Sequence, residues 1–137
     1  MKRRRFLAAA GTAGTVGIAG CSGVLGSEDY DVGMTATMFV PTDLTVEAGT
    51  TVIWENTSAR SHTVTAYESD LPDGAEYFAS GGFEDETTAR EAWWNDRGGI
   101  LESGDRFTHT FEIPGEYRYV CIPHETGGMI GSVIVEE

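Results

Sequence analysis

From Val32 onward, apolar and polar residues alternate in short runs, and turn-forming residues interrupt these runs at regular intervals. Alternation with a period of two is the pattern of strands that bury one face, and closely spaced strands of this kind are typical of an antiparallel sandwich or barrel. The pattern therefore predicts an all-β domain with strands at Met34–Val40, Leu44–Glu47, Thr51–Glu55, His62–Tyr67, Phe107–Ile113, Tyr117–Cys121 and Met129–Val135.

A Pro114–Gly115 pair separates the strands predicted at Phe107–Ile113 and Tyr117–Cys121. Proline fixes its own φ and glycine permits unusual values of φ, so this pair favours a tight turn. We therefore expect the two strands to form a hairpin.

Side chains alternate faces along a strand, which places Cys121 on the same face as Tyr117 and Tyr119. The thiol is therefore expected at the inward end of an aromatic ladder. In the preceding strand the same rule places three rings on one face: Phe107, His109 and Phe111. The histidine of this set is accordingly interpreted as a core residue and not as a metal ligand.

The segment Ser69–Gly104 does not follow the strand pattern. Within it, Glu84–Asn95 tolerates a helix, in which Ala89, Ala92 and Trp93 would share an apolar stripe. We expect a long excursion with a short helix that packs against the barrel through Trp93 or Trp94. A cofactor role for these tryptophans is the less favoured alternative.

The first 20 residues have the pattern of an export signal. A basic cluster precedes the mildly apolar run Phe6–Ala19, which is too short and too rich in glycine and threonine to span a bilayer. Residues 3–7 (RRRFL) resemble the twin-arginine export motif. Residues 18–21 (IAGC) resemble a lipobox, in which the cysteine is lipidated and becomes the first mature residue.

These motifs divide the chain into a signal peptide at 1–20, a small polar tether at 21–31 and a domain at 32–137. Lipid on Cys21 would hold the domain at the extracytoplasmic face of the cell membrane after twin-arginine export. The alternative, a disulfide between Cys21 and Cys121, is disfavoured because it would join a flexible tether to a thiol that lies among other metal-ligating residue types.

The domain is strongly acidic. All 22 acidic residues follow Cys21, against five arginines and no lysine, which gives this part of the chain a net charge of −17. Nucleic acids and anionic lipid surfaces bind through basic residues, so both are excluded as partners. The acidity is interpreted as solubility in concentrated salt, with a docking patch for a basic redox partner as the alternative.

Three metal-ligating residue types lie close together near the C-terminus: the thiol of Cys121, the imidazole of His124 and the thioether of Met129. Two histidines with one cysteine and a weak axial methionine form an electron-transfer copper site. His62 is the best candidate for the missing histidine, because the loop before it can share one end of a sandwich with the loop that carries the other three. Each residue alone would more often be core or surface, but the set indicates a metal site.

These residues carry a resemblance to a known family. Between Gly104 and Val135 it rests on Phe107-Thr108-His109-Thr110-Phe111, Pro114-Gly115, Tyr117, Tyr119, Cys121, Pro123-His124, Gly128-Met129 and Gly131, and upstream on Ala48–Trp54, Asn56 and His62. The chain resembles plastocyanin-like cupredoxins, and its acidic lipoprotein setting resembles halocyanin. The resemblance covers roughly residues 32 to 137.

The resemblance implies a Greek-key β-sandwich and one type 1 (blue) copper ion bound by His62, Cys121, His124 and Met129. It also implies a carrier of single electrons between a donor and an acceptor associated with the membrane. Asn56 resembles the residue that steadies the ligand loops of the family through hydrogen bonds. The chain departs from plastocyanin in the long interval of 58 residues between His62 and Cys121.

Other classes of function fit the sequence less well. Copper oxidases and nitrite reductases need further histidine ligands, and the chain has three histidines in all, so we expect no enzymatic activity. The runner-up is an extracytoplasmic copper-binding protein for copper delivery or storage, which would favour exposed methionines. Met34 and Met38, four residues apart on one predicted strand, share a face and are interpreted as core residues. We further expect a monomer.

Overall fold

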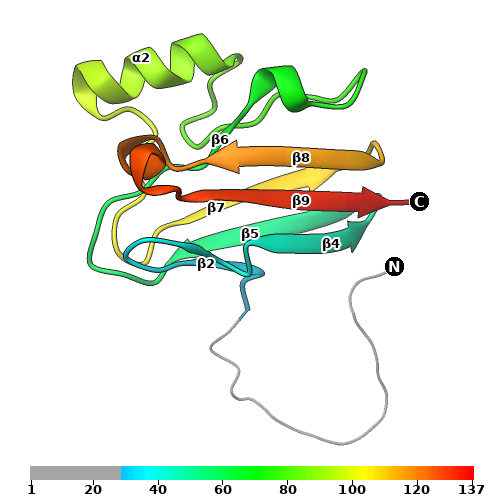
Figure 1. Cartoon of the computed structure of the whole chain (residues 1–137), viewed down its shortest axis with the longest axis horizontal. Helices are drawn as coiled ribbons and strands as arrows, with labels where there is room; N and C mark the ends of the chain where they lie inside the picture. Colours follow the sequence, from blue (N-terminus) through cyan, green and yellow to red (C-terminus); the bar gives the residue numbers. More distant parts are fainter. Residues whose placement is uncertain (1–28) are drawn as a thin grey trace, which may run out of the picture.

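The computed structural model describes residues 29–137, which form a sandwich of two four-stranded sheets (Figure 1). The strand order is β3-β2-β5-β7 in one sheet and β4-β9-β8-β6 in the other. The strands are β2 (Val32–Met34), β3 (Phe39–Val40), β4 (Asp43–Glu47), β5 (Thr50–Asn56), β6 (Thr65–Ala66), β7 (Arg106–Phe111), β8 (Gly115–Val120) and β9 (Ile130–Glu136). The helical elements are the 3₁₀ helices η1 (Glu68–Asp70) and η2 (Ile122–Gly127) and the α-helix α2 (Glu86–Asp96). The prediction of an all-β sandwich with one short helix is confirmed.

Strand pairing differs from the prediction at one turn. β7 pairs with β5 in the first sheet, whereas β8 pairs with β6 and β9 in the second. The expected hairpin between Phe107–Ile113 and Tyr117–Cys121 is therefore wrong, because the Pro114–Gly115 turn carries the chain from one sheet to the other. Turn chemistry fixes where the chain changes direction, but burial of the two apolar faces decides which strands pair.

The predicted strand Met34–Val40 is broken by a turn. Thr35 N donates to Met38 O at 2.9 Å, and Thr35 Oγ1 accepts from Met38 N at 3.1 Å. The turn reverses the chain, so that β3 pairs antiparallel with β2. Met34 is consequently buried while Met38 is 52% exposed, and the prediction that both share a buried face is wrong.

Aromatic side chains fill the space between the sheets. Trp54 in β5 is fully buried, with its ring centre 5.4 Å from that of Tyr119 and 5.5 Å from that of Phe107. Tyr117 and Cys121 are buried beside Tyr119, as the alternation along this strand predicts. The thiol therefore lies at the end of a rigid aromatic core.

The excursion contains the expected helix, which begins at Glu86 because Asp85 caps it: Asp85 Oδ1 accepts from Thr88 N at 2.7 Å. Ala89 and Trp93 are buried, whereas Trp94 is 68% exposed. Of the two tryptophans proposed to pack against the barrel, Trp93 is the buried one. The helix contacts β6, and it extends above the end of the second sheet where η2 lies (Figure 1).

The predicted signal peptide, the twin-arginine and lipobox motifs, Cys21 and most of the tether lie outside the described residues. Contacts with the sandwich begin before Val32. Asp29 pairs with Arg106, and Asp31 N donates to Ile53 O at 2.8 Å. In residues 29–137, no helix is long and apolar enough to cross a membrane.

Candidate metal centre

The loop after β8 brings Cys121, His124 and Met129 together through its own backbone. Cys121 N donates to Met129 O at 3.0 Å, and His124 N donates to Cys121 O at 3.1 Å. Gly128 adopts a φ of 88°, a left-handed conformation that glycine takes at little cost, and this closes the loop at the end of η2. The short spacing along the chain thus becomes a tight loop around one point.

His62 reaches this loop from the other sheet. It follows β5 and forms an isolated bridge with Leu101, in which His62 N donates to Leu101 O at 3.1 Å and His62 O accepts from Leu101 N at 2.8 Å. The predicted strand His62–Tyr67 is shorter than expected, since only Thr65 and Ala66 form a regular strand. His62 is therefore held by a crossing segment of the excursion and not by a sheet ladder.

Asn56 steadies the His62 loop, as the family resemblance implies. Its Nδ2 donates to Arg60 O at 2.6 Å and to Leu101 O at 2.8 Å, and its Oδ1 accepts from Ser58 N at 2.9 Å. Asn56 is fully buried, so these hydrogen bonds are not exchanged with water. One side chain thus joins both segments that frame His62.

The donor atoms of three predicted residues converge. Cys121 Sγ lies 3.4 Å from His62 Nδ1 and 3.3 Å from His124 Nδ1, and the three donor atoms all lie within 4.8 Å of one another. Met129 is 1% exposed, and its N–H donates to His124 O at 3.3 Å. The structure therefore brings all four predicted site residues to one end of the sandwich.

Burial sets the protonation of this cluster. It lowers the pKa of His62 to about 4, helped by the neighbouring His124, and it lowers the pKa of His124 as well. Burial also raises the pKa of the Cys121 thiol to about 11. At neutral pH both imidazoles are uncharged and can donate a lone pair, whereas the thiol must lose one proton on binding a metal.

Sequence reasoning missed two residues that support the cluster. Ser58 Oγ lies 3.1 Å from His62 Nε2, so this hydroxyl can accept a hydrogen bond from Nε2–H. The unprotonated Nδ1 then faces Cys121. Thr63 Oγ1 accepts from Ile122 N at 2.9 Å and so ties the residue after His62 to the residue after Cys121. Neither position shows a signal in the sequence, because each acts through a contact between distant segments.

His109 lies outside this cluster, as expected, but it is only partly buried. Its ring stacks on Phe78 with centres 4.8 Å apart and meets Phe111 edge-on. Burial lowers the pKa of His109. In the described part of the chain, the one group of three potential metal-ligating residues is His62, Cys121 and His124.

The donor set fits copper. One thiol and two imidazoles, with a thioether in the same loop, are the soft and borderline ligands of copper sites and not the oxygen ligands that calcium or magnesium requires. Hydrogen bonds and aromatic core contacts of the protein itself hold both ligand segments.

Known proteins support this interpretation. The family model described as copper binding proteins, plastocyanin/azurin family, matches residues 27–136. The chain belongs to the plastocyanin/azurin family. Plastocyanin of Scenedesmus fuscus is 30% identical to it over 101 residues, covering 74% of this chain and 89% of that protein. Chloroplastic plastocyanin of Tetradesmus obliquus is 31% identical over 101 residues, and this match spans 60% of that protein's length.

Solved cupredoxin structures share the fold. A pseudoazurin from Sinorhizobium superposes with a TM-score of 0.58 at 27% identity, covering 79% of this chain and 73% of that one. A variant of amicyanin superposes with a TM-score of 0.56 at 24% identity, covering 80% and 85%. The predicted cupredoxin-like sandwich is thus confirmed. Cupredoxins of this family are blue copper electron carriers, and copper is the metal of this protein.

Proposed function

We propose that His62, Cys121, His124 and Met129 bind one type 1 copper ion and that this cupredoxin is a one-electron carrier without enzymatic activity of its own. The convergence of the Cys121 thiol with two imidazole nitrogens at the end of an aromatic core carries this proposal. When bound to such ligands, copper supplies a couple between Cu(II) and Cu(I).

The residues of the site supply a fixed geometry. His62 and Cys121 are fully buried, and the surrounding hydrogen bonds of Asn56, Ser58 and Thr63 restrict their movement. Cys121 releases its proton and binds as a thiolate. Because the ligands move little, the reorganisation that opposes electron transfer stays small.

His124 marks where redox partners approach. Of the three converging donor residues it alone is partly exposed, and Gly127 and Gly128 beside it are exposed as well. A donor or acceptor protein therefore comes closest to the site at the imidazole edge of His124. The described domain exposes three large hydrophobic side chains, Met38, Val40 and Trp94, a small number that supports a monomer between encounters.

We further propose a halocyanin-type lipoprotein: a signal peptide at 1–20, a tether from Cys21 to Asp31 and a cupredoxin domain at 32–137. The RRRFL and IAGC motifs support twin-arginine export and lipid on Cys21. The domain then works at the extracytoplasmic face of the membrane, with membrane-associated redox partners. Extraction of native membranes tests this, because protein released by high salt without detergent would contradict a lipid anchor.

The visible spectrum and a redox titration of the copper-loaded protein test the carrier function. We expect an intense thiolate-to-copper band that disappears and returns reversibly with a one-electron couple. A protein that binds copper without this band, or without a reversible couple, would not be a blue copper carrier. Ready release of copper to a chelator together with such a result would favour copper delivery or storage.

Replacement of Met129 by leucine is expected to keep the blue colour but shift the reduction potential. A methionine at the axial position binds weakly and tunes the potential more than it holds the metal. Met129 is 1% exposed, and leucine has a similar volume. The substitution should therefore lower the free energy of unfolding by about 1 kcal/mol or less. Spectroelectrochemistry measures both effects, and an unchanged potential would contradict the axial role.

A further inference from the structure

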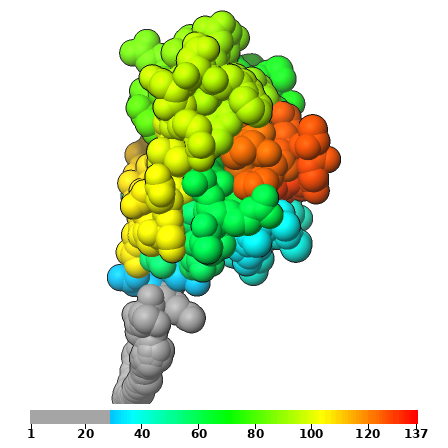
Figure 2. Space-filling model, turned by 90° about the vertical axis from the view of Figure 1, so that its left-hand side faces the viewer, coloured from blue at the N-terminus to red at the C-terminus, as the bar shows by residue number. Residues whose placement is uncertain are grey.

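An ion pair fastens the excursion to the ligand loop directly beside His124. Arg90 in α2 donates from Nη1 to Glu125 Oε1 at 2.8 Å and from Nη2 to Glu125 Oε2 at 3.1 Å. Its third donor, Nε, bonds Glu86 Oε2 at 2.8 Å. Glu125 follows His124 in η2, and the surfaces of α2 (yellow-green) and η2 (orange-red) adjoin in Figure 2.

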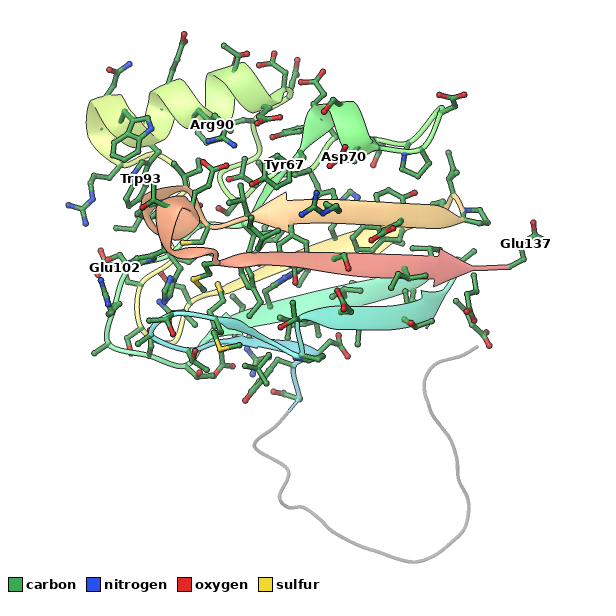
Figure 3. All side chains as sticks on the ribbon, in the orientation of Figure 1. Tyr67, Asp70, Arg90, Trp93, Glu102 and Glu137 are labelled. Carbon is green, nitrogen blue, oxygen red and sulfur yellow. The ribbon has the colours of Figure 1, made fainter. Side chains whose placement is uncertain are left out.

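A second element holds the same carboxylate. Tyr67, at the end of β6, donates its hydroxyl to Glu125 Oε2 at 2.8 Å, and Tyr67 N donates to Arg118 O in β8 at 2.9 Å. The guanidinium carbon of Arg90 lies 5.8 Å from the centre of the Tyr67 ring. Figure 3 shows Arg90 and Tyr67 in the region between α2 and β8. Glu125 is thus fixed both from the excursion and from the sheet.

The helix that carries Arg90 is itself anchored. Glu68 N donates to Glu86 Oε1 at 2.9 Å, and Glu86 N donates to Glu68 Oε1 at 3.1 Å, so η1 and α2 cap each other. Ala89 and Trp93 bury the inner face of the helix. Because the helix is fixed in place, its ion pair with Glu125 restricts the movement of the loop that carries His124.

The ligand loop needs such support. Gly127 and Gly128 in its second half are exposed, and its backbone hydrogen bonds at this point are local, such as Gly128 N to Glu125 O at 2.9 Å. Isolated surface ion pairs contribute little, but a bidentate arginine within a network is the exception. The side chains of Arg90 and Glu125 are 28% and 34% exposed, so the pair is largely shielded from solvent.

We propose that Arg90 is a positioning residue for the metal centre, whose bidentate bond to Glu125 makes the excursion a brace that holds the His124 loop in its binding geometry. This inference rests on the proposed function, because it concerns His124 as a ligand. It assigns a role to the long interval between His62 and Cys121.

Hydrogen exchange of the metal-free protein tests the brace independently of copper. In Arg90→Gln and in Glu125→Gln, the amides of His124, Gly128 and Met129 should exchange about fivefold faster, since loss of a bidentate pair in a network frees the loop to open. Arg118→Gln is the matched control. It removes the same charge from the other side of the Tyr67 ring, where Arg118 pairs with Asp70 at 3.6 Å and not with Glu125, and should leave these rates unchanged.

The reduction potential separates positioning from charge alone. Arg90→Gln removes the positive charge that balances the Glu125 carboxylate beside the site, which favours the more positive oxidised state and lowers the potential. Glu125→Gln removes the negative charge and raises the potential. Arg90→Lys keeps the positive charge but loses the bidentate hydrogen bonding of the guanidinium. The loop amides should therefore exchange faster, while the reduction potential stays close to that of the natural protein.

Loop amides that exchange equally in Arg90→Gln and Arg118→Gln would overturn the proposal, and so would potential shifts with unchanged exchange. Restored slow exchange in the swapped double variant Arg90→Glu/Glu125→Arg would support it further. Because exchange is measured without copper, failure of the carrier function would appear separately, as a missing blue band in the natural protein.

Discussion

Replacement of Cys121 by serine is expected to abolish the thiolate-to-copper band of the copper-loaded protein. Cys121 Sγ lies 3.4 Å from His62 Nδ1 and 3.3 Å from His124 Nδ1, so the sulfur is the donor that both imidazoles face. A hydroxyl is a poor ligand for copper at neutral pH and has no comparable charge-transfer transition. Visible absorption at matched copper loading measures the loss.

The same variant should keep its fold. Cys121 is fully buried, but the serine hydroxyl that replaces its thiol can form a hydrogen bond with either neighbouring imidazole nitrogen. The free energy of unfolding of the metal-free protein should therefore change by about 1 kcal/mol. Urea unfolding followed by circular dichroism measures it, and a Cys121→Ser variant that stays blue would refute the thiolate assignment.

The sequence predicted the ligand loop better than the support around it. Cys121, His124 and Met129 lie within nine consecutive residues, so their spacing and chemistry alone brought them together. His62 is distant in the chain, and its assignment rested on the expected sandwich, on the exclusion of His109 and on the family resemblance. The hydrogen bond between Ser58 and His62 could not be predicted, because it depends on a ring orientation that the whole core determines.

The fold shows the same division between local and distant contacts. Alternation along Tyr117–Cys121 correctly predicted which side chains point inward, since a strand imposes that period by itself. The hairpin at Pro114–Gly115 was wrong, because pairing depends on which sheet buries each strand. Similarly, the turn after Met34 depends on the Thr35 side chain and backbone, which an apolar run conceals.

The excursion shows why an interval that departs from the family pattern can still serve the site. Its helix was expected from spacing, but no pattern in the sequence singled out Arg90. In the structure, Arg90 faces the ligand loop and Leu101 bonds the His62 backbone. The excursion therefore contacts both segments that carry ligands.

His62→Gln and His109→Gln form a matched pair that decides which histidine binds copper. We expect His62→Gln to lower copper affinity by at least about 100-fold, because loss of a hydrogen-bonding partner of a ligand already costs 10- to 100-fold and here the ligand itself is lost. Its Nδ1 is 3.4 Å from Cys121 Sγ, a place that a longer amide side chain does not fill equivalently. Competition with a chelator of known affinity measures the change.

His109→Gln should leave copper affinity within about twofold and the spectrum unchanged, because a change remote from the ligands and their hydrogen-bonding partners does not alter the metal's surroundings. The His109 ring stacks on Phe78, so the substitution instead removes core contacts and lowers the free energy of unfolding. Thermal unfolding of the metal-free His109→Gln variant measures this loss. If the blue band were lost in His109→Gln and kept in His62→Gln, His109 and not His62 would be the copper ligand, and the assignment of His62 would be wrong.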